Sequence, residues 1–505
     1  MGNSYHISDK NPANIPLAGI PVLPYEQFTR EIRLLMSPGS AHCLNYFVIP
    51  EKDHYRFICL IADDAKGTIH GLSHITVSGP GVKLNSITPA HSVFHIFERE
   101  IHEAFGVDFT GHPWQKPVRY PFDRADKNLC LENYDFYRIE GEEVHEVGVG
   151  PIHAGVIEPG HFRFTCNGEK VLFLEIQLGY QHRGVESLLE GNAAPLKKIL
   201  LSESIAGDTA IGYALCHVQM MESLGGIKVS SELLKERIID LEMERIAVHI
   251  GDMAALCGDI AYQLGQAVFE ALRTIVINTM QQWCGNRFGK GLLRPGGTCH
   301  PLSRDLQKIL QERLSEVEQR FIQMTTRLFS MPSVLSRFES TGRVTLRQAE
   351  LLGLVGMAAR SSGLKRDLRW SHPFQAFRGM NYDPVILNEG DVWARAKLRE
   401  AEVLKSMGVV RELIKTLPAE RKEESPVNGS GLFPSTLSVS AVEGWRGEIV
   451  HTAVTDETGK IIRYKVKDPS LHNWMALAVA MRNQEISDFP LCNKSFNLSY
   501  CGHDL

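Results

Sequence analysis

Residues 230–280 read SSELLKERIIDLEMERIAVHIGDMAALCGDIAYQLGQAVFEALRTIVINTM, and this stretch decides the fold class. Its apolar residues recur three and four positions apart, the spacing that gathers them on one face of an α-helix. The same pattern continues from about Ala193 to Leu417. It predicts a large helical bundle in this part of the chain.

The residues before this region have a different pattern, which predicts a mixed α/β domain. Three short runs are rich in β-branched and aromatic residues, as strands are: CLNYFVIP (43–50), YRFICLIAD (55–63) and SHITVSG (73–79). Two stretches have helical spacing: EQFTREIRLLM (26–36) and HSVFHIFEREIHEAFG (91–106), which ends at a glycine. We therefore expect a compact N-terminal domain of strands and helices.

An acidic, weakly patterned segment at 129–150 is typical of a connector. It separates an α/β domain at 1–128 from a larger domain at 151–505. Alternating patterns in the larger domain predict two β-hairpins, at 161–179 and 444–468, one on each side of the helical region. The predicted fold class is α+β: an N-terminal mixed α/β domain, then a large helical-bundle domain with flanking β-hairpins.

The composition argues against several classes of protein. With a net charge of -5, the chain has no broad positive potential for binding nucleic acid. No run approaches the roughly 18 apolar residues of a membrane span, and the N-terminus lacks the features of a signal peptide, so we expect a cytoplasmic protein. No two of the 10 cysteines stand in a CxxC spacing, which argues against a zinc or iron–sulfur site in this chain.

Particular motifs carry a resemblance to a known family. The stretch FEREIHEAFGVDFTGHPWQKPVRYPF (97–122) resembles the signature of the small hydrophilic subunit of respiratory complex I, which lies beside the quinone-site subunit. The matching residues are Glu98, Arg99, Glu100, Phe105, Gly106, Phe109, Gly111, His112, Pro113 and Arg119.

A second series of motifs covers most of the remaining chain. It consists of GPIHAGVIEPGHFRF, YQHRGVE, ERIAVHIGDMAAL, GNRFGKGLLRPGG, GLVGMAARSSGLKRDLR, GDVWARAKLREAE and RYKVKDPSLHNW. In this order they resemble the large subunit shared by complex I and the energy-converting nickel–iron hydrogenases. Both units in one chain resemble the hydrogenase-4 and formate hydrogenlyase large subunits.

The resemblance also predicts where a nickel–iron centre would be bound. In a working hydrogenase of this family, four cysteine thiolates hold the metals, because soft anionic sulfur suits that metal pair. Here the first pair of ligand positions falls on Ala206 and Thr209, and the second pair on Ser470 and Asn473. We therefore predict an oxidoreductase-like subunit without a nickel–iron centre and without hydrogenase activity.

The resemblance singles out several candidate catalytic residues. His153 and His161 stand in a loop that borders the family's catalytic cavity, where an imidazole can give a proton to a reduced acceptor. Glu186 stands where the hydrogenases use a glutamate as a proton relay, and Arg183 could neutralise it. The alternatives are that the histidines cap a turn or pack against the hairpin, and that Glu186 forms a structural salt bridge.

Asp208 and Thr209 immediately precede a predicted helix, so one of them is expected to cap it. In the alternative interpretation, the Asp208 carboxylate binds a proton or orients a ligand at the former metal position. Asp468 and His472 belong to the second metal motif and should then face Asp208. His472 would otherwise be a surface residue in the first turn of the final helix.

The resemblance implies a peripheral subunit on the cytoplasmic side of the inner membrane. Its expected partners are an iron–sulfur small subunit, a ferredoxin-like subunit and membrane subunits that translocate ions. This chain would bind no cofactor itself, the cluster would lie on a partner, and a quinone is a possible acceptor. An open pocket lined by Asp208, Glu186 and a histidine would fit this function. The alternative is a non-catalytic structural or coupling subunit whose former metal space is filled by apolar packing.

Overall fold

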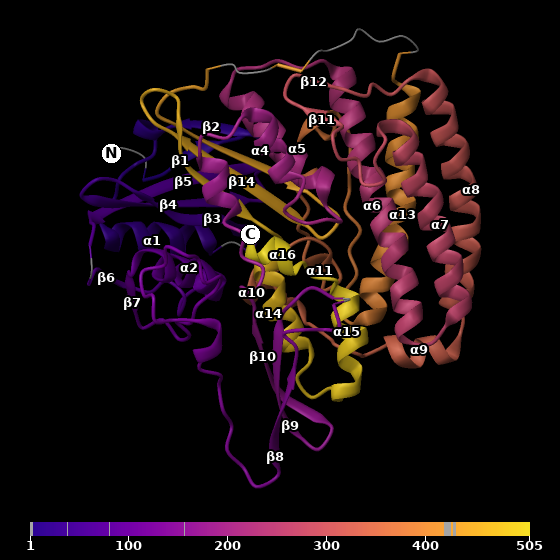
Figure 1. The fold of residues 1–505 in the computed structure, drawn as a ribbon, viewed down its shortest axis with the longest axis horizontal. Coiled ribbons are helices and arrows are strands. Elements are labelled where there is room, and N and C mark those ends of the chain that lie inside the picture. The colour runs from indigo at the N-terminus through magenta and orange to yellow at the C-terminus, as the bar shows by residue number, and fades with distance from the viewer. Residues whose placement is uncertain (1–3, 38, 80, 156, 419–425, 428–430) are drawn as a thin grey trace.

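A computed structural model of the 505-residue chain describes residues 4–37, 39–79, 81–155, 157–418, 426–427 and 431–505. Figure 1 shows the N-terminal sheet on one side of the molecule and a bundle of long helices on the other, with the C-terminal helices between them. This arrangement is the α+β fold that the sequence predicts.

The N-terminal strands and helices confirm the sequence pattern. The sheet has the order β1-β5-β4-β3 and is antiparallel, with β1 (His6–Ser8), β3 (Ala41–Pro50), β4 (His54–Asp63) and β5 (Thr68–Val77). Two helices accompany it, α1 (Tyr25–Met36) and α2 (His95–Phe105). Helix α2 stops at Gly106, whose φ of 69° is the left-handed conformation that glycine adopts without strain.

This sheet is covered on both faces. Successive side chains of a strand point to opposite faces, and those of β3 divide accordingly between two apolar clusters. Tyr46 and Val48 pack in a cluster with residues of α1 and α2, whereas Phe47 and Ile49 belong to the core that includes the second sheet. The N-terminal sheet is therefore the middle layer between two helices and the rest of the protein.

The second sheet combines the predicted C-terminal hairpin with a strand from the N-terminus. Its order is β15-β14-β13-β2, with β2 (Ala13–Pro16), β13 (Thr436–Glu443), β14 (Glu448–Thr455) and β15 (Ile461–Lys467). In the register, Ile15 lies opposite Leu437. The first residues of the chain are thus tied to its last sheet.

The third sheet contains the other predicted hairpin and projects from the lower part of the molecule in Figure 1. It consists of β8 (Val144–Val149), β9 (His161–Asn167) and β10 (Lys170–Gln177) in the order β10-β9-β8. Strand β8 lies within the segment that the sequence pattern assigns to a connector. That segment therefore ends as an edge strand of the larger domain.

The predicted helical bundle is confirmed, with α6 (Ser231–Asp259), α7 (Gln263–Cys284), α8 (Arg304–Leu328) and α13 (Val392–Lys415) as its long helices. Helix α5 (Ala210–Leu224) follows the first pair of metal positions, and the first turn of α14 (Ser470–Ala480) contains the second pair. The shorter helices are α3 (Val185–Glu190), α4 (Pro195–Ser202), α9 (Pro332–Phe338), α10 (Leu346–Leu352), α11 (Gly356–Arg360), α12 (Leu368–Ser371), α15 (Phe489–Phe496) and α16 (Tyr500–Asp504). Two small ladders join β6 (Lys83–Asn85) to β7 (Asp108–Thr110), and β11 (Leu293–Arg294) to β12 (Gly297–Thr298). None of the described helices is both long enough and apolar enough to cross a membrane.

A buried cluster of charges joins α11, α12 and α13, and α6 adds Arg245, which lies 3.6 Å from Glu402. Arg369 donates to Asp367 at 2.7 Å and to Glu402 at 2.9 Å, and Arg360 lies 3.4 Å from the same glutamate. Burial alone would raise the pKa of Glu402, but the guanidinium groups around it hold that pKa far below its usual value. Each charge in the cluster therefore depends on the others, because an unpaired charge in this core would be very costly.

Replacing Glu402 by glutamine tests this dependence. Glu402→Gln should lower the free energy of unfolding by about 3–5 kcal/mol, because it leaves buried guanidinium groups undercompensated. Glu412→Gln, on an exposed position of the same helix, is the matched control and should change stability by less than about 0.5 kcal/mol. Urea unfolding of the two variants and the parent compares them, and equal midpoints would contradict the interpretation.

Candidate functional site

The turn before α5 places Asp208 against an arginine of the second sheet. Both carboxylate oxygens of Asp208 accept from the Arg446 guanidinium, at 2.7 and 2.6 Å, and Thr209 donates to the same carboxylate at 3.0 Å. Burial raises the pKa of Asp208, but the Arg446 charge outweighs it and holds that pKa below its usual value. Asp208 is therefore a charged partner of Arg446.

The prediction that Asp208 or Thr209 caps α5 is wrong. Thr209 occupies the N-cap position without accepting a hydrogen bond from the helix. The first amide groups of α5 instead donate to the Glu244 carboxylate on α6, from Ile211 at 2.7 Å and from Gly212 at 3.2 Å. Burial raises the pKa of Glu244 to about 8. A side chain from a distant helix thus replaces the local cap.

The second metal motif is fastened by its own contacts. The Tyr213 hydroxyl of α5 donates to Asp468, and the other oxygen of that carboxylate accepts from the Ser470 amide at 2.6 Å. The Asn473 side chain accepts from the Val355 amide at 3.2 Å and donates to the Val355 carbonyl at 3.1 Å. Helix α5 therefore joins the two motifs, since it starts at the first and contacts the second.

The turn between β13 and β14, residues 443–448, lies between the two motifs. Arg446 of this turn binds Asp208, and its backbone packs against Gly356, the residue after Val355. A Cβ atom on Gly356 would lie 2.2 Å from the Arg446 carbonyl oxygen, so only glycine fits there. Burial lowers the pKa of Arg446, but the charge of Asp208, with a smaller contribution from Asp468, outweighs burial and raises it. Of these two carboxylates, Asp208 is the one that contacts the Arg446 guanidinium.

His472 is buried in the first turn of α14, so its interpretation as a surface residue is wrong. Its side chain lies edge-on to Phe97 of α2 at a ring distance of 5.3 Å. Within the described residues, neither ring nitrogen has a hydrogen-bond partner. Burial holds its pKa well below the usual value, so the imidazole is neutral near pH 7.

Glu186 forms an ion pair, but not with Arg183. Its carboxylate contacts the Lys465 ammonium at 2.7 Å and accepts from the Val466 amide at 2.9 Å. Arg183 instead donates to the carbonyls of Ser204 and Ile205, at 2.8 and 2.9 Å. The prediction that Arg183 neutralises Glu186 is wrong, because Arg183 precedes α3 and turns toward the residues that follow α4.

His153 and His161 fasten the two ends of the loop between β8 and β9. The His153 ring lies 2.9 Å from the Gly160 carbonyl, and the His161 ring lies 3.2 Å from the Gly150 carbonyl. Burial lowers the pKa of His161, whose ring also lies edge-on to Phe136 at 5.2 Å. Both histidines thus hold a turn, as one of the two sequence interpretations expects, and they lie where the loop from β8 enters β9, the central strand of the third sheet.

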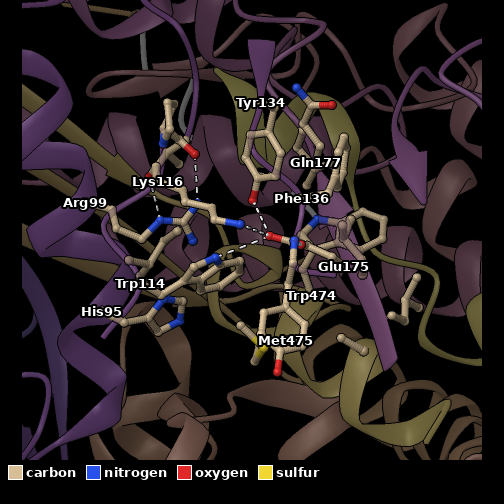
Figure 2. Close-up of a pocket in the computed structure, with 18 of the residues that line it drawn as sticks. His95, Arg99, Trp114, Lys116, Tyr134, Phe136, Glu175, Gln177, Trp474 and Met475 are labelled. Atoms are coloured by element: carbon tan, nitrogen blue, oxygen red, sulfur yellow. Dashed lines mark hydrogen bonds and ion pairs between the residues drawn. The ribbon is translucent and has the colours of Figure 1, made fainter. Parts of the chain in front are cut away.

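A large cavity that the sequence reasoning missed lies where α2, the connector, β10 and α14 meet (Figure 2). Its volume is about 660 Å³. Its wall includes Glu175, which accepts from the Tyr134 hydroxyl at 2.8 Å, from Lys116 at 2.9 Å, from the Trp114 indole at 3.3 Å and from the Tyr137 amide at 2.7 Å. This one buried carboxylate fixes the connector to the N-terminal unit and to β10.

Two sequence features could have indicated this cavity. The connector carries the aromatic run YDFYR at 134–138, and the first motif contains HPWQK at 112–116. Each combines aromatic and cationic residues, as ligand-binding walls often do. Neither shows that the two segments meet, because that depends on the path of the connector across β10.

With the geometry established, comparison with known proteins decides the family. Residues 39–125 match the family of the respiratory-chain NADH dehydrogenase 30 Kd subunit, and residues 265–429 and 427–504 match that of the 49 Kd subunit. The chain is a fusion of these two complex I subunit types. Both units of the fusion are the ones that the motifs predict.

The fused chain is also related to membrane-bound hydrogenases. It is 29% identical over 355 residues to the carbon monoxide-induced hydrogenase of Rhodospirillum rubrum, covering 70% of this chain and 97% of that protein. It is 27% identical over 435 residues to formate hydrogenlyase subunit 5 of Escherichia coli, covering 82% and 76%. With the NADH-quinone oxidoreductase C/D subunit of Bacteroides thetaiotaomicron it shares 24% identity over 399 residues, covering 72% and 74%. The chain is a complex I-like, hydrogenase-4-like oxidoreductase subunit.

A double-mutant cycle tests the Asp208–Arg446 pair. Asp208→Asn, Arg446→Gln and the double variant should give a coupling energy of about 1–2 kcal/mol, within the range of contacting charges. A larger value is not expected, because 37% of the Asp208 side chain is accessible to water, which screens the pair. The exposed Arg313–Glu316 pair, at 3.5 Å, is the control and should couple by less than about 0.5 kcal/mol. Equal coupling in the two cycles would refute the assignment.

Acid unfolding tests the ion pairs that join the two units. Lys465 contacts both Glu186 and Glu100, and Arg119 contacts Glu100 as well. Burial raises the pKa of Glu100, but these two cations outweigh it and depress that pKa. A depressed carboxyl pKa stabilises the folded state above the unfolded pKa of about 4.3 and loses that contribution as pH falls.

Glu100→Gln should therefore flatten the loss of thermal stability between about pH 5 and pH 3, because glutamine does not titrate. Glu312→Gln, at an exposed position of α8, should leave the pH profile unchanged. Melting temperatures measured across this range give the comparison. A Glu100→Gln profile as steep as that of the parent would show that the pair adds nothing to acid stability.

Proposed function

We propose that this chain is the peripheral large subunit of a membrane-bound oxidoreductase that transfers electrons without a nickel–iron centre. The single observation that carries the proposal is the Asp208–Arg446 pair, in which a bidentate contact at 2.7 and 2.6 Å occupies the first motif. An aspartate bound to arginine in this way is not free to act as a metal ligand.

The residues at the four metal positions do not fit nickel and iron. Ala206 offers a methyl group, Thr209 and Ser470 offer hydroxyls, and Asn473 offers an amide. Thr209 accepts from the Trp445 indole at 3.0 Å, and the Ser470 hydroxyl accepts from the Ser499 amide at 2.9 Å. These groups lack the charge and softness that the metal pair needs, and their oxygens are engaged in hydrogen bonds.

In this proposal, electrons enter from an iron–sulfur cluster on a partner small subunit. They would pass to a diffusible acceptor such as a quinone, which takes up two electrons and two protons. His153 and His161, at the loop between β8 and β9, would supply protons to that acceptor. A ferredoxin-like subunit and ion-translocating membrane subunits would complete the complex on the cytoplasmic side of the inner membrane.

A non-catalytic coupling subunit is the second candidate, and one observation favours it. Glu186 and Asp208 are both neutralised by buried cations, Lys465 and Arg446. Lys465 also contacts Glu100 of α2, so this pairing spans the 30 Kd-type and 49 Kd-type units. Such a network suits a part that transmits a change in conformation rather than one that moves protons.

Metal content tests the primary proposal. Complex purified through a tag on this chain should contain less than about 0.1 nickel per chain and evolve no hydrogen from reduced methyl viologen, because the thiolate ligands are absent. A nickel-containing hydrogenase relative prepared in the same way controls for metal loss during purification. Stoichiometric nickel would refute the proposal.

Acceptor reduction separates the two candidates. If the chain carries an acceptor site, the purified complex should reduce menadione with reduced methyl viologen as donor. His161→Gln should then lower the rate at least about tenfold, because a positioned proton donor contributes about 10²–10⁴. His54→Gln, at an exposed position of β4, is the control. An intact complex whose menadione reduction is unaffected by His161→Gln would support the coupling subunit.

A further inference from the structure

The cavity of Figure 2 contains a buried cation without a carboxylate partner. Arg99 on α2 is 6% exposed, and its guanidinium donates to the carbonyls of Lys116 and Pro117, both at 2.7 Å. Within the described residues it forms no ion pair. Burial lowers its pKa by more than the charges of Glu103 and Glu175 raise it. A buried guanidinium that is hydrogen-bonded only to carbonyls is a positive charge that a bound anion would stabilise.

Flat apolar surfaces accompany this charge. The Arg99 guanidinium lies 4.2 Å above the Trp114 ring, which stacks in turn on His95 with ring centroids 5.9 Å apart at 24°. Aromatic side chains of the connector, of β10 and of α14 line the rest of the cavity, among them Tyr137, Phe173 and Trp474. Ring systems on several walls favour a planar ligand that can stack between them.

Two further groups line the cavity. His95 is 9% exposed, and its Nδ1 atom has no hydrogen-bond partner among the described residues. Exposed Arg138 and Arg482 lie at the rim, and Arg482 lies 5.5 Å from the Phe173 ring. The lining thus offers one unused polar group inside and further positive charge at the entrance.

The acidic side chains that line the cavity do not balance the positive charge of its arginine and lysine side chains. Glu175 is already saturated by four donors, including Lys116, and Asp135 is an exposed residue. Four Arg and Lys side chains line the cavity against two Asp and Glu side chains. The volume of about 660 Å³ lies within the range of about 300–1,000 Å³ of small-molecule sites.

We propose that this cavity binds a planar conjugated ring that carries an anionic group, with the ring between the aromatic walls and the anion near Arg99 or the rim arginines. A flavin mononucleotide and a purine mononucleotide share this chemistry. The site lies at the junction of the two units and is independent of the acceptor proposed above. The measured nickel content of the complex therefore does not affect this proposal.

Equilibrium dialysis of the full-length chain against FMN, riboflavin and AMP tests the proposal. FMN should bind at least about tenfold more tightly than riboflavin, because only FMN carries the phosphate. Its fluorescence should fall on binding as the ring stacks on an indole. AMP binding tighter than FMN would assign the site to purines, and it would support the same ligand class.

Rim variants locate the binding without disturbing the core. Arg482→Gln should weaken FMN at least about threefold and leave riboflavin unchanged, whereas Tyr137→Ala should weaken both alike. The controls are Arg313→Gln and Phe122→Ala, which remove an exposed arginine and an exposed aromatic ring that do not line the cavity. Arg99→Gln, if it folds, should abolish the preference for FMN over riboflavin.

Three results would overturn the proposal: equal binding of FMN and riboflavin with no AMP binding, binding that survives both Arg482→Gln and Tyr137→Ala, and no binding of any probe. A fourth would be hydrogen-exchange protection of residues 134–138 by a partner polypeptide that excludes FMN from the purified complex. That result would assign the cavity to a protein contact.

Discussion

The structure depends on the charges of one short turn, residues 443–448 between β13 and β14. Glu443 at its start accepts from Arg360 at 2.7 Å, and Glu448 at its end lies 2.6 Å from His42 of the N-terminal sheet. Arg446 between them binds Asp208. Each contact joins the turn to a different part of the chain, and buried charges cannot give up a partner cheaply. The position of this turn therefore fixes Arg360, the N-terminal sheet and the turn before α5 relative to one another.

This constraint explains why an aspartate stands in the turn before α5. Arg446 is buried and requires an anion, whatever else occupies the neighbouring positions. The four positions that the family resemblance assigns to metal ligands are uncharged here, so they supply no anion for Arg446. We infer that Asp208 is the anion that keeps Arg446 compensated, and that it does so as a structural partner whose pKa stays low.

The sequence predicts what depends on local periodicity, and it fails where distant segments meet. The residue patterns find the bundle, both hairpins and the strands β3, β4 and β5 of the N-terminal sheet, but not β1. They do not find the pairing of β2 with β13, because strand partners so far apart leave no local signal. The sequence also does not predict that Glu186 pairs with Lys465 rather than Arg183, because β15 lies beside α3 only in the folded chain. The cavity at the junction is formed by segments that lie far apart in the sequence, so it could not be assembled from motifs alone.

The charged residues of α2 show that the cavity is lined by a cation without an anionic partner, which a simple packing gap between the two units would not require. Glu98 accepts from Ser86 and Thr88, and Glu100 is paired with Arg119 and Lys465. Glu103 accepts from the Arg119 amide at 3.0 Å and from the Tyr120 amide at 2.7 Å. Every acidic side chain of this helix thus has donors, and these contacts fix the helix against both units. Arg99, between two of these glutamates, turns away from them toward the cavity and donates only to backbone carbonyls among the described residues. The carboxylates of α2 all have donors, whereas Arg99 has no anionic partner among the described residues. This arrangement favours the binding of an external anion at Arg99.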